Sequence, residues 1–207
     1  HGVEKIKIPK EDEEKFASFV IPNMKKAGEL FLDSGVEEKF YQRPLEASIY
    51  LDRLGDDITA SFIFNYGDYK IDPFAPKQDV HDNYIVIRDY EKERDILDIF
   101  ESSNFRINKD MVYLDDEESI YDFITNRVPK LQDMSTVYYS DAFKNMKIYD
   151  TSYYTSSIRL NEDSDLLEFS FSIDGIQKEK LPEIFASLRE KKQYYRLPDG
   201  SFIPLDT

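Results

Sequence analysis

Two runs of alternating apolar and polar residues, 46–53 and 58–66, flank the triplet Gly55-Asp56-Asp57. Alternation with a period of two predicts strands that bury one face, and this connection has the composition of a short hairpin turn. The Gly67-Asp68 turn and a third short strand at 69–71 follow directly. We therefore expect an antiparallel sheet that is built from hairpins.

Helical periodicity predicts about four amphipathic helices around these strands. The first covers residues 12–32 and is expected to bend near Pro22, and the second covers 89–103. The third follows Asp115 and Asp116, which are candidate N-caps, and is disturbed by Pro129. The fourth covers 178–192. The residues expected to face inward are Phe16, Val20, Met24, Ala27 and Phe31; Ile96, Leu97 and Phe100; Ile120, Phe123, Ile124 and Val128; and Leu181, Ile184, Phe185 and Leu188.

Further strands are expected at 84–88, 111–114, 136–139, 146–148, 153–160 and 166–173, with a last hairpin at 194–197 and 201–204. The fold class is therefore α+β, with mostly antiparallel hairpins. We expect one module over residues 3–207, with two lobes at about 3–133 and 134–207 as the alternative. His1 and Gly2 are interpreted as a cloning remnant, and the chain as an excised piece of a longer protein.

The composition excludes several functions. The sequence has 42 acidic and 27 basic residues, a net charge of −15, which disfavours a dedicated nucleic-acid binder. It contains no Cys, which excludes disulfides, thiol nucleophiles and zinc fingers, and its two His leave almost no ligands for a transition-metal site. Its longest apolar runs are far shorter than the roughly 20 residues that span a bilayer. We expect no membrane contact and a cytoplasmic location.

No catalytic or cofactor motif is recognisable. A P-loop needs clustered glycines followed by Gly-Lys-Ser or Gly-Lys-Thr, and neither tripeptide occurs. A serine triad could use only His81, which lies in a polar loop and is more simply a solvated histidine. Residues 161–165 alternate oxygen-bearing side chains as a calcium loop does, but Leu166 stands where Gly is required, so a hairpin turn is the better interpretation. We expect no catalytic residue, cofactor or metal.

Acidic residues are concentrated between positions 79 and 124, which hold 14 acids and five bases. The outer faces of two surface helices explain this segment most simply. The alternative is an acidic surface that repels DNA or occupies a basic groove of a partner domain.

The stretch from Ala186 to Phe202, ASLREKKQYYRLPDGSF, resembles the end of the helicase-associated domain that precedes the motor in bacterial SNF-two (SWI/SNF-type) helicases. Further pieces agree in order over roughly residues 15–205, namely Arg43-Pro44-Leu45, Tyr50-Leu51-Asp52, Tyr66-Gly67-Asp68-Tyr69, Pro73-Phe74, Ile87-Arg88-Asp89 and Val137-Tyr138-Tyr139-Ser140. The resemblance implies a zinc-binding segment upstream and an ATP-dependent, DNA-tracking motor downstream, and it transfers no catalytic residue to this chain.

Two functions remain open. The first is a non-enzymatic accessory or regulatory module that contacts the ATPase motor of the same chain or other proteins. The second is a DNA-contacting module. Its candidate basic patches are Lys5, Lys7 and Lys10 with Lys25 and Lys26, and Arg189, Lys191, Lys192 and Arg196. The acidic total favours the first function, with DNA bound only weakly or indirectly.

The C-terminal helix and hairpin are the expected contact with the motor. Three aromatic residues occur there beside four cations, a composition typical of an anchoring patch. The candidate partner-binding residues are Arg189, Lys191, Lys192, Tyr194, Tyr195, Arg196 and Phe202. The competing interpretation is that one tyrosine is buried and that Leu197 and Ile203 simply close the sheet.

Overall fold

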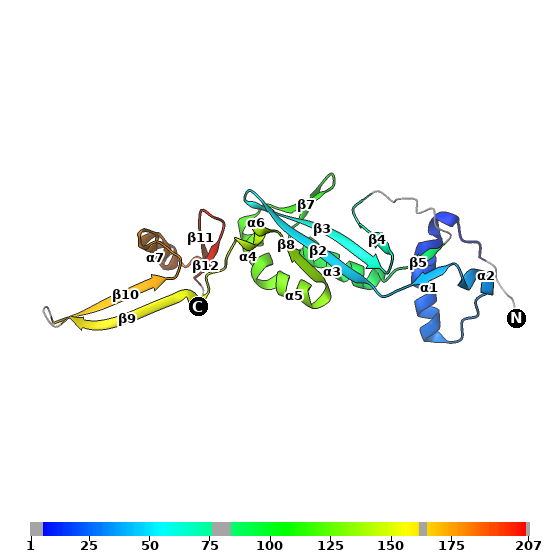
Figure 1. Ribbon diagram of the computed structural model, residues 1–207, viewed down its shortest axis with the longest axis horizontal. Coiled ribbons are helices and arrows are strands. Elements are labelled where there is room, and N and C mark those ends of the chain that lie inside the picture. The colour runs from blue at the N-terminus through cyan, green and yellow to red at the C-terminus, as the bar shows by residue number, and fades with distance from the viewer. Residues whose placement is uncertain (1–5, 76–83, 162–164, 206–207) are drawn as a thin grey trace. The chain divides into compact units, whose positions relative to one another are not determined.

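The computed structural model describes residues 6–75, 84–161 and 165–205, and the chain forms two compact units, 1–140 and 141–207 (Figure 1). Both units combine helices with short, mostly antiparallel strands. The predicted α+β class is therefore confirmed. That the chain acts as a single accessory module stays a prediction.

The first unit consists of a sheet and of helices that precede, interrupt and follow its strands along the chain. A 3-10 turn (Lys10–Asp12) precedes the first helix, and a π-helical turn (Phe123–Arg127) joins α4 to α5. The elements are α1 (Glu13–Ala27), α2 (Ser34–Glu37), β1 (Phe40–Gln42), β2 (Glu46–Leu54), β3 (Asp57–Tyr66), β4 (Tyr69–Ile71), β5 (Ile85–Ile87), α3 (Tyr90–Ser102), β6 (Arg106–Asn108), β7 (Met111–Leu114), α4 (Glu117–Asp122), α5 (Val128–Met134) and β8 (Thr136–Tyr139).

A six-stranded sheet organises this unit in the order β6-β7-β3-β2-β8, with β4 also paired to β3. The predicted hairpin is confirmed: β2 and β3 pair antiparallel from Leu54 opposite Asp57 to Glu46 opposite Asn65. Gly55 takes a φ of 67° in the connecting turn, a conformation that favours glycine. Two parallel pairings, β2 with β8 and β1 with β5, were not predicted.

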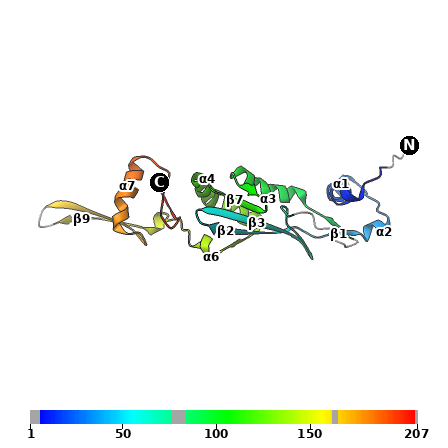
Figure 2. The same ribbon diagram turned by 90° about the horizontal axis from the view of Figure 1, so that it is seen from above.

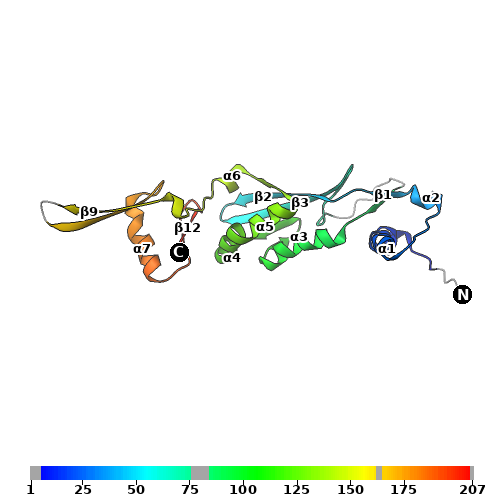
Figure 3. The same ribbon diagram turned by 90° about the horizontal axis from the view of Figure 1, so that it is seen from below.

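The core of the first unit lies between one face of the sheet and helices α3, α4 and α5, which cover that face in Figure 3. Alternate residues of β3, from Ile58 to Tyr66, are buried there. The rings of Phe62 and Phe100 meet edge to face at 4.7 Å, which joins the sheet to α3. Asp116 accepts a hydrogen bond from the Ser119 N–H at 2.8 Å, so the predicted N-cap of α4 is confirmed.

The predicted inward face of the first helix is wrong. Phe16, Met24 and Phe31 are 42%, 48% and 87% exposed, whereas Ala17 and Ile21 are buried, and α1 ends at Ala27 instead of continuing to residue 32. The reason is the partner of α1, because the helix packs on β5, a strand of three residues, and buries only a narrow strip of its surface.

The second unit contains two separate hairpins and two helices, α6 and α7, among its described residues. One 3-10 turn (Thr151–Tyr153) precedes β9, and another (Lys178–Lys180) precedes α7. The elements are α6 (Asp141–Lys144), β9 (Tyr154–Asn161), β10 (Leu166–Ile173), α7 (Leu181–Arg189), β11 (Tyr194–Arg196) and β12 (Phe202–Pro204). The strand expected at 146–148 is reduced to a single bridge between Ile148 and Phe202.

Helix α7 lies against the end of the β9–β10 ribbon at which β9 begins, as Figures 1 and 2 show. Ile184 is buried as predicted, but Phe185 and Leu188 are partly exposed, at 37% and 46%. A ribbon of two strands offers a helix only a narrow strip, so the inward face predicted for the fourth helix is too wide. Leu197 and Ile203 join the core of this unit beside Ile184.

Candidate functional site

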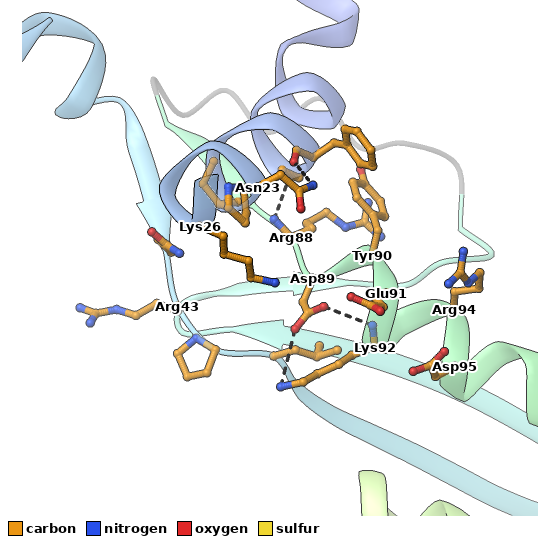
Figure 4. Close-up of a pocket in the computed structure, with 17 residues that line it drawn as sticks. Asn23, Lys26, Arg43, Arg88, Asp89, Tyr90, Glu91, Lys92, Arg94 and Asp95 are labelled. Atoms are coloured by element: carbon orange, nitrogen blue, oxygen red, sulfur yellow. Dashed lines mark hydrogen bonds and ion pairs between the residues drawn. The ribbon is translucent and has the colours of Figure 1, made fainter. Parts of the chain in front are cut away.

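A groove of about 1130 Å³ lies between the C-terminal half of α1, the connection from β1 to β2, and the start of α3 (Figure 4). All of its walls belong to the first unit. Its lining combines apolar side chains, such as Phe19 and Pro22, with charged side chains of both signs. It is the place where this acidic chain gathers five basic side chains, namely Lys26, Arg43, Arg88, Lys92 and Arg94.

Arg88 fixes the inner wall of the groove through a buried ion pair. Its Nε donates to Glu93 Oε1 at 2.9 Å and its Nη2 donates to Glu93 Oε2 at 2.6 Å. A third nitrogen, Nη1, lies 3.3 Å from Glu14 Oε1 on α1, and the guanidinium stacks over the Tyr90 ring at 4.7 Å. Burial alone would lower the pKa of Arg88, but the hydrogen bonds and charge of Glu93 raise it.

Tyr66 extends this cluster into the sheet. Its hydroxyl donates to Glu93 Oε1 at 2.6 Å and accepts a hydrogen bond from the Asp89 N–H at 2.8 Å. Burial and the bond to Glu93 raise the pKa of Tyr66 far above its ordinary value. The cluster therefore joins β3, α3 and α1.

The other polar groups of the wall are also engaged. Ser18 Oγ accepts a hydrogen bond from the Arg88 N–H at 2.9 Å and donates to the Val86 carbonyl at 3.4 Å. Asp89 caps α3 by accepting from the Lys92 N–H at 3.2 Å. Ser18 and Asp89 are thus both engaged in holding the wall together, and Asp89 Oδ2 also lies 3.6 Å from Lys92 Nζ.

The exposed cations of the groove differ from Arg88. In the part of the chain that the structure describes, Lys26, Arg43 and Arg94 form no ion pair. Figure 4 shows Lys26 reaching toward the start of α3, with Arg43 and Arg94 on opposite sides of the groove. Glu91 and Asp95 line the groove as well, so its exposed charges are of both signs.

The candidate partner-binding residues near the C-terminus divide into a cationic set and an aromatic set, and the cationic set comes first in the chain. Arg189, the last residue of α7, is exposed, as are Lys191 and Lys192 in the turn between α7 and β11, where Lys192 pairs with Glu190 at 3.1 Å. Lys191 has a φ of 57°, so the chain reverses sharply at these cations.

The aromatic candidates anchor this turn. Phe202 is fully buried, with the Tyr194 ring edge to face at 5.3 Å and the Arg196 guanidinium at 5.4 Å. Tyr195 is half-buried and its hydroxyl donates to Glu183. Phe202 is thus a core residue and offers no ring to a partner; partner binding by the other six residues stays a prediction.

Sequence analysis missed most of the groove. Lys25 and Lys26 were singled out, and Lys25 Nζ lies 3.4 Å from Gln42 Oε1 at the edge of the groove, but Lys5 lies outside the described residues. Glu93 could have been found, because it precedes Ile96 by three residues and Phe100 by seven and so continues the buried stripe of α3. His81 and residues 162–164 of the rejected calcium loop also lie outside the described ranges.

The other acids of α3, namely Glu91, Asp95, Asp98 and Glu101, are exposed, as expected for the outer face of a surface helix.

Among the described residues, none of the helices is long and apolar enough to cross a membrane. The same residues contain no group of three side chains that could hold a metal ion.

Comparison with known families gives one clear result. A model of the family described as bacterial SNF2 helicase associated matches residues 2–207. The chain belongs to this family, whose description indicates an accessory region of SNF2-type helicases. Comparisons with curated proteins and with solved structures give no match.

Proposed function

We propose that this chain is a non-catalytic accessory or regulatory domain of a bacterial SNF2-type, DNA-dependent ATPase, and that it acts by contacting the motor of the same protein. Family membership supports the context. The groove supports a binding role, because its lining combines apolar side chains with charged side chains of both signs. The net charge of −15 supports contact with protein in preference to DNA.

One observation carries the location of the contact. Arg189 at the end of α7 and Lys191 and Lys192 in the following turn are exposed, and the turn leads into β11, where Tyr194 packs against the buried Phe202. A backbone that is already held in place does not have to be ordered on binding, which favours affinity. The positive charge of these three side chains on an acidic chain suits an acidic surface of the motor.

The test is a charge reversal in the parent helicase. We expect Arg189→Glu with Lys191→Glu to change the DNA-stimulated ATPase rate several-fold while the thermal midpoint of the 207-residue chain stays within about 2 °C, since both side chains are exposed. The matched control is Lys109→Glu with Lys130→Glu, which changes the net charge equally at exposed positions of the first unit. Equal ATPase rates in the two double variants would contradict the proposal.

A second candidate function is direct contact with DNA, and the unpaired cations of the groove favour it. Lys26, Arg43 and Arg94 could meet phosphates, although the acidic face of α3 lies beside them. We expect duplex DNA to bind the chain no tighter than about 10⁻⁴ to 10⁻⁶ M at physiological salt, the non-specific range. Submicromolar binding with a steep salt dependence, lost in Lys26→Glu with Arg43→Glu, would promote this second function.

A further inference from the structure

The β9–β10 ribbon has one apolar face and one polar face. Cross-strand pairing sets Leu160 opposite Leu167 and Ile158 opposite Phe169, all on the same side. These four residues, which we call the ribbon face, are between 57% and 74% exposed. The opposite side carries Arg159 opposite Glu168 and Ser157 hydrogen-bonded to Ser170 at 2.7 Å.

The ribbon face continues a surface that is already packed. Phe171 follows Phe169 on the same side, and its ring lies 5.5 Å from Phe185 of α7. Helix α7 covers only this end of the ribbon, and no other described element of the second unit lies beside the half that carries the ribbon face (Figures 1, 2 and 3). A two-stranded ribbon with one uncovered apolar face is marginally stable in water.

We propose that a second copy of this chain covers the ribbon face, so that two ribbons pack face to face as a small two-layered sheet. Such a contact is isologous, because the same four side chains are buried on both copies. Two sheets stacked about 10 Å apart are a normal way for apolar strand faces to be removed from water.

The apolar area that the ribbon face offers supports a second copy as its occupant. Each of the four side chains offers roughly 100 Å² of exposed surface, given that a full aromatic side chain buries 150–250 Å². Two facing copies, with the adjoining edges of Phe171 and Phe185, would bury roughly 1,000 Å² in total, at the lower end of specific interfaces. The expected dimer is therefore weak, with dissociation in the micromolar range.

Charge permits this contact but does not drive it. The ribbon face itself contains no charged residue. Residues 141–207 contain 12 acids and nine bases, a balance of −3, and residues 154–173 alone contain four acids and one base, the same balance. Like charges therefore oppose the contact weakly, and the dimer should tighten as salt is raised. A nucleic acid is disfavoured because no cation lies on the face. This inference concerns a different surface from the proposed motor contact and does not depend on it.

The chain contains no cysteine, so a single introduced thiol reports contact between copies without background. Ile158→Cys places the thiol on the ribbon face and Ser170→Cys places it on the opposite face of the same ribbon. Under mild oxidation we expect Ile158→Cys to form a disulfide-linked dimer at least ten times faster than Ser170→Cys. Equal rates would overturn the proposal.

Light scattering supplies the second measurement. The mass of the wild-type chain should rise from 24.4 kDa toward twice that value as its concentration is raised into the hundreds of micromolar. Phe169→Glu should stay monomeric and Ser170→Glu should not, with thermal midpoints confirming that both fold. A wild-type chain that stays monomeric, or a Phe169→Glu variant that still dimerises, would overturn the proposal and leave the motor as the occupant of the ribbon face.

Discussion

Glu93 receives two hydrogen bonds from Arg88 across the first turn of α3, at 2.9 Å from Nε and 2.6 Å from Nη2. The Glu93 side chain is only 5% exposed and that of Arg88 only 14% exposed, so the pair is largely removed from water. It joins the strand β5, the helix α3 and, through Glu14, the helix α1. The inner wall of the groove therefore depends on one carboxylate.

Replacing that carboxylate should be strongly destabilising. Glu93→Ala leaves the Arg88 charge buried with only Glu14 beside it, and we expect a loss of about 3 kcal/mol in the free energy of unfolding, measured with urea. The paired replacement Arg88→Met with Glu93→Leu removes both charges and should lower the free energy of unfolding by clearly less than Glu93→Ala does. A loss below about 1 kcal/mol for Glu93→Ala would contradict the structural role of the pair.

Gly67 should be sensitive to substitution because of its backbone conformation. It has a φ of 62°, and a Cβ there would overlap the hydroxyl of Tyr41, which accepts a hydrogen bond from the Asp68 N–H at 3.2 Å. We expect Gly67→Ala to lower the free energy of unfolding by more than about 1 kcal/mol. Gly28→Ala is the matched control, because Gly28 is extended with open space around it, and it should be close to neutral.

Stability should fall at alkaline pH. The Tyr195 hydroxyl donates a hydrogen bond to Glu183, which raises the pKa of Tyr195 to about 12. Burial raises the pKa of Tyr90 to about 12. An unfolded tyrosine ionises near pH 10, so the stabilisation is fully present below pH 10 and is lost as the pH rises toward 12. Urea unfolding between pH 8 and 11 should show this decline, and Tyr195→Phe should make it shallower. An unchanged slope in Tyr195→Phe would contradict the assigned bond.

The chain should neither bind nor hydrolyse ATP by itself. It has no phosphate-binding loop in its sequence, and the described groove keeps Arg88 occupied by Glu93 and Glu14. Calorimetric titration with ATP should give no saturable heat. Saturable binding at micromolar concentration would contradict a purely accessory role.

Local patterns predicted most of the elements. The hairpin of β2 and β3 follows from period-two alternation around Gly55, and the start of α4 follows from the capping side chain of Asp116. These features depend on residues that are close together in the sequence. The parallel pairings of β1 with β5 and of β2 with β8 join segments that are far apart, and no local pattern encodes them.

The buried faces and the groove were harder to predict for the same reason. The inward face of α1 depends on its contact with β5, which is not visible in the spacing of its apolar residues. Arg88 and Glu14 are 74 positions apart, so their contact could not be inferred from one sequence. The exposed ribbon face reads in the sequence as an ordinary amphipathic hairpin, because the pattern does not say whether anything covers it.

Lysine acylation footprinting of the parent helicase tests the proposed motor contact most directly. Lys191 and Lys192 are exposed in this chain, as are the reference residues Lys109 and Lys130. If the turn between α7 and β11 contacts the motor, the first two lysines should be acylated several-fold more slowly in the parent protein than in the 207-residue chain, while the reference lysines keep their rates. Unchanged acylation of Lys191 and Lys192 in the parent protein would contradict the account.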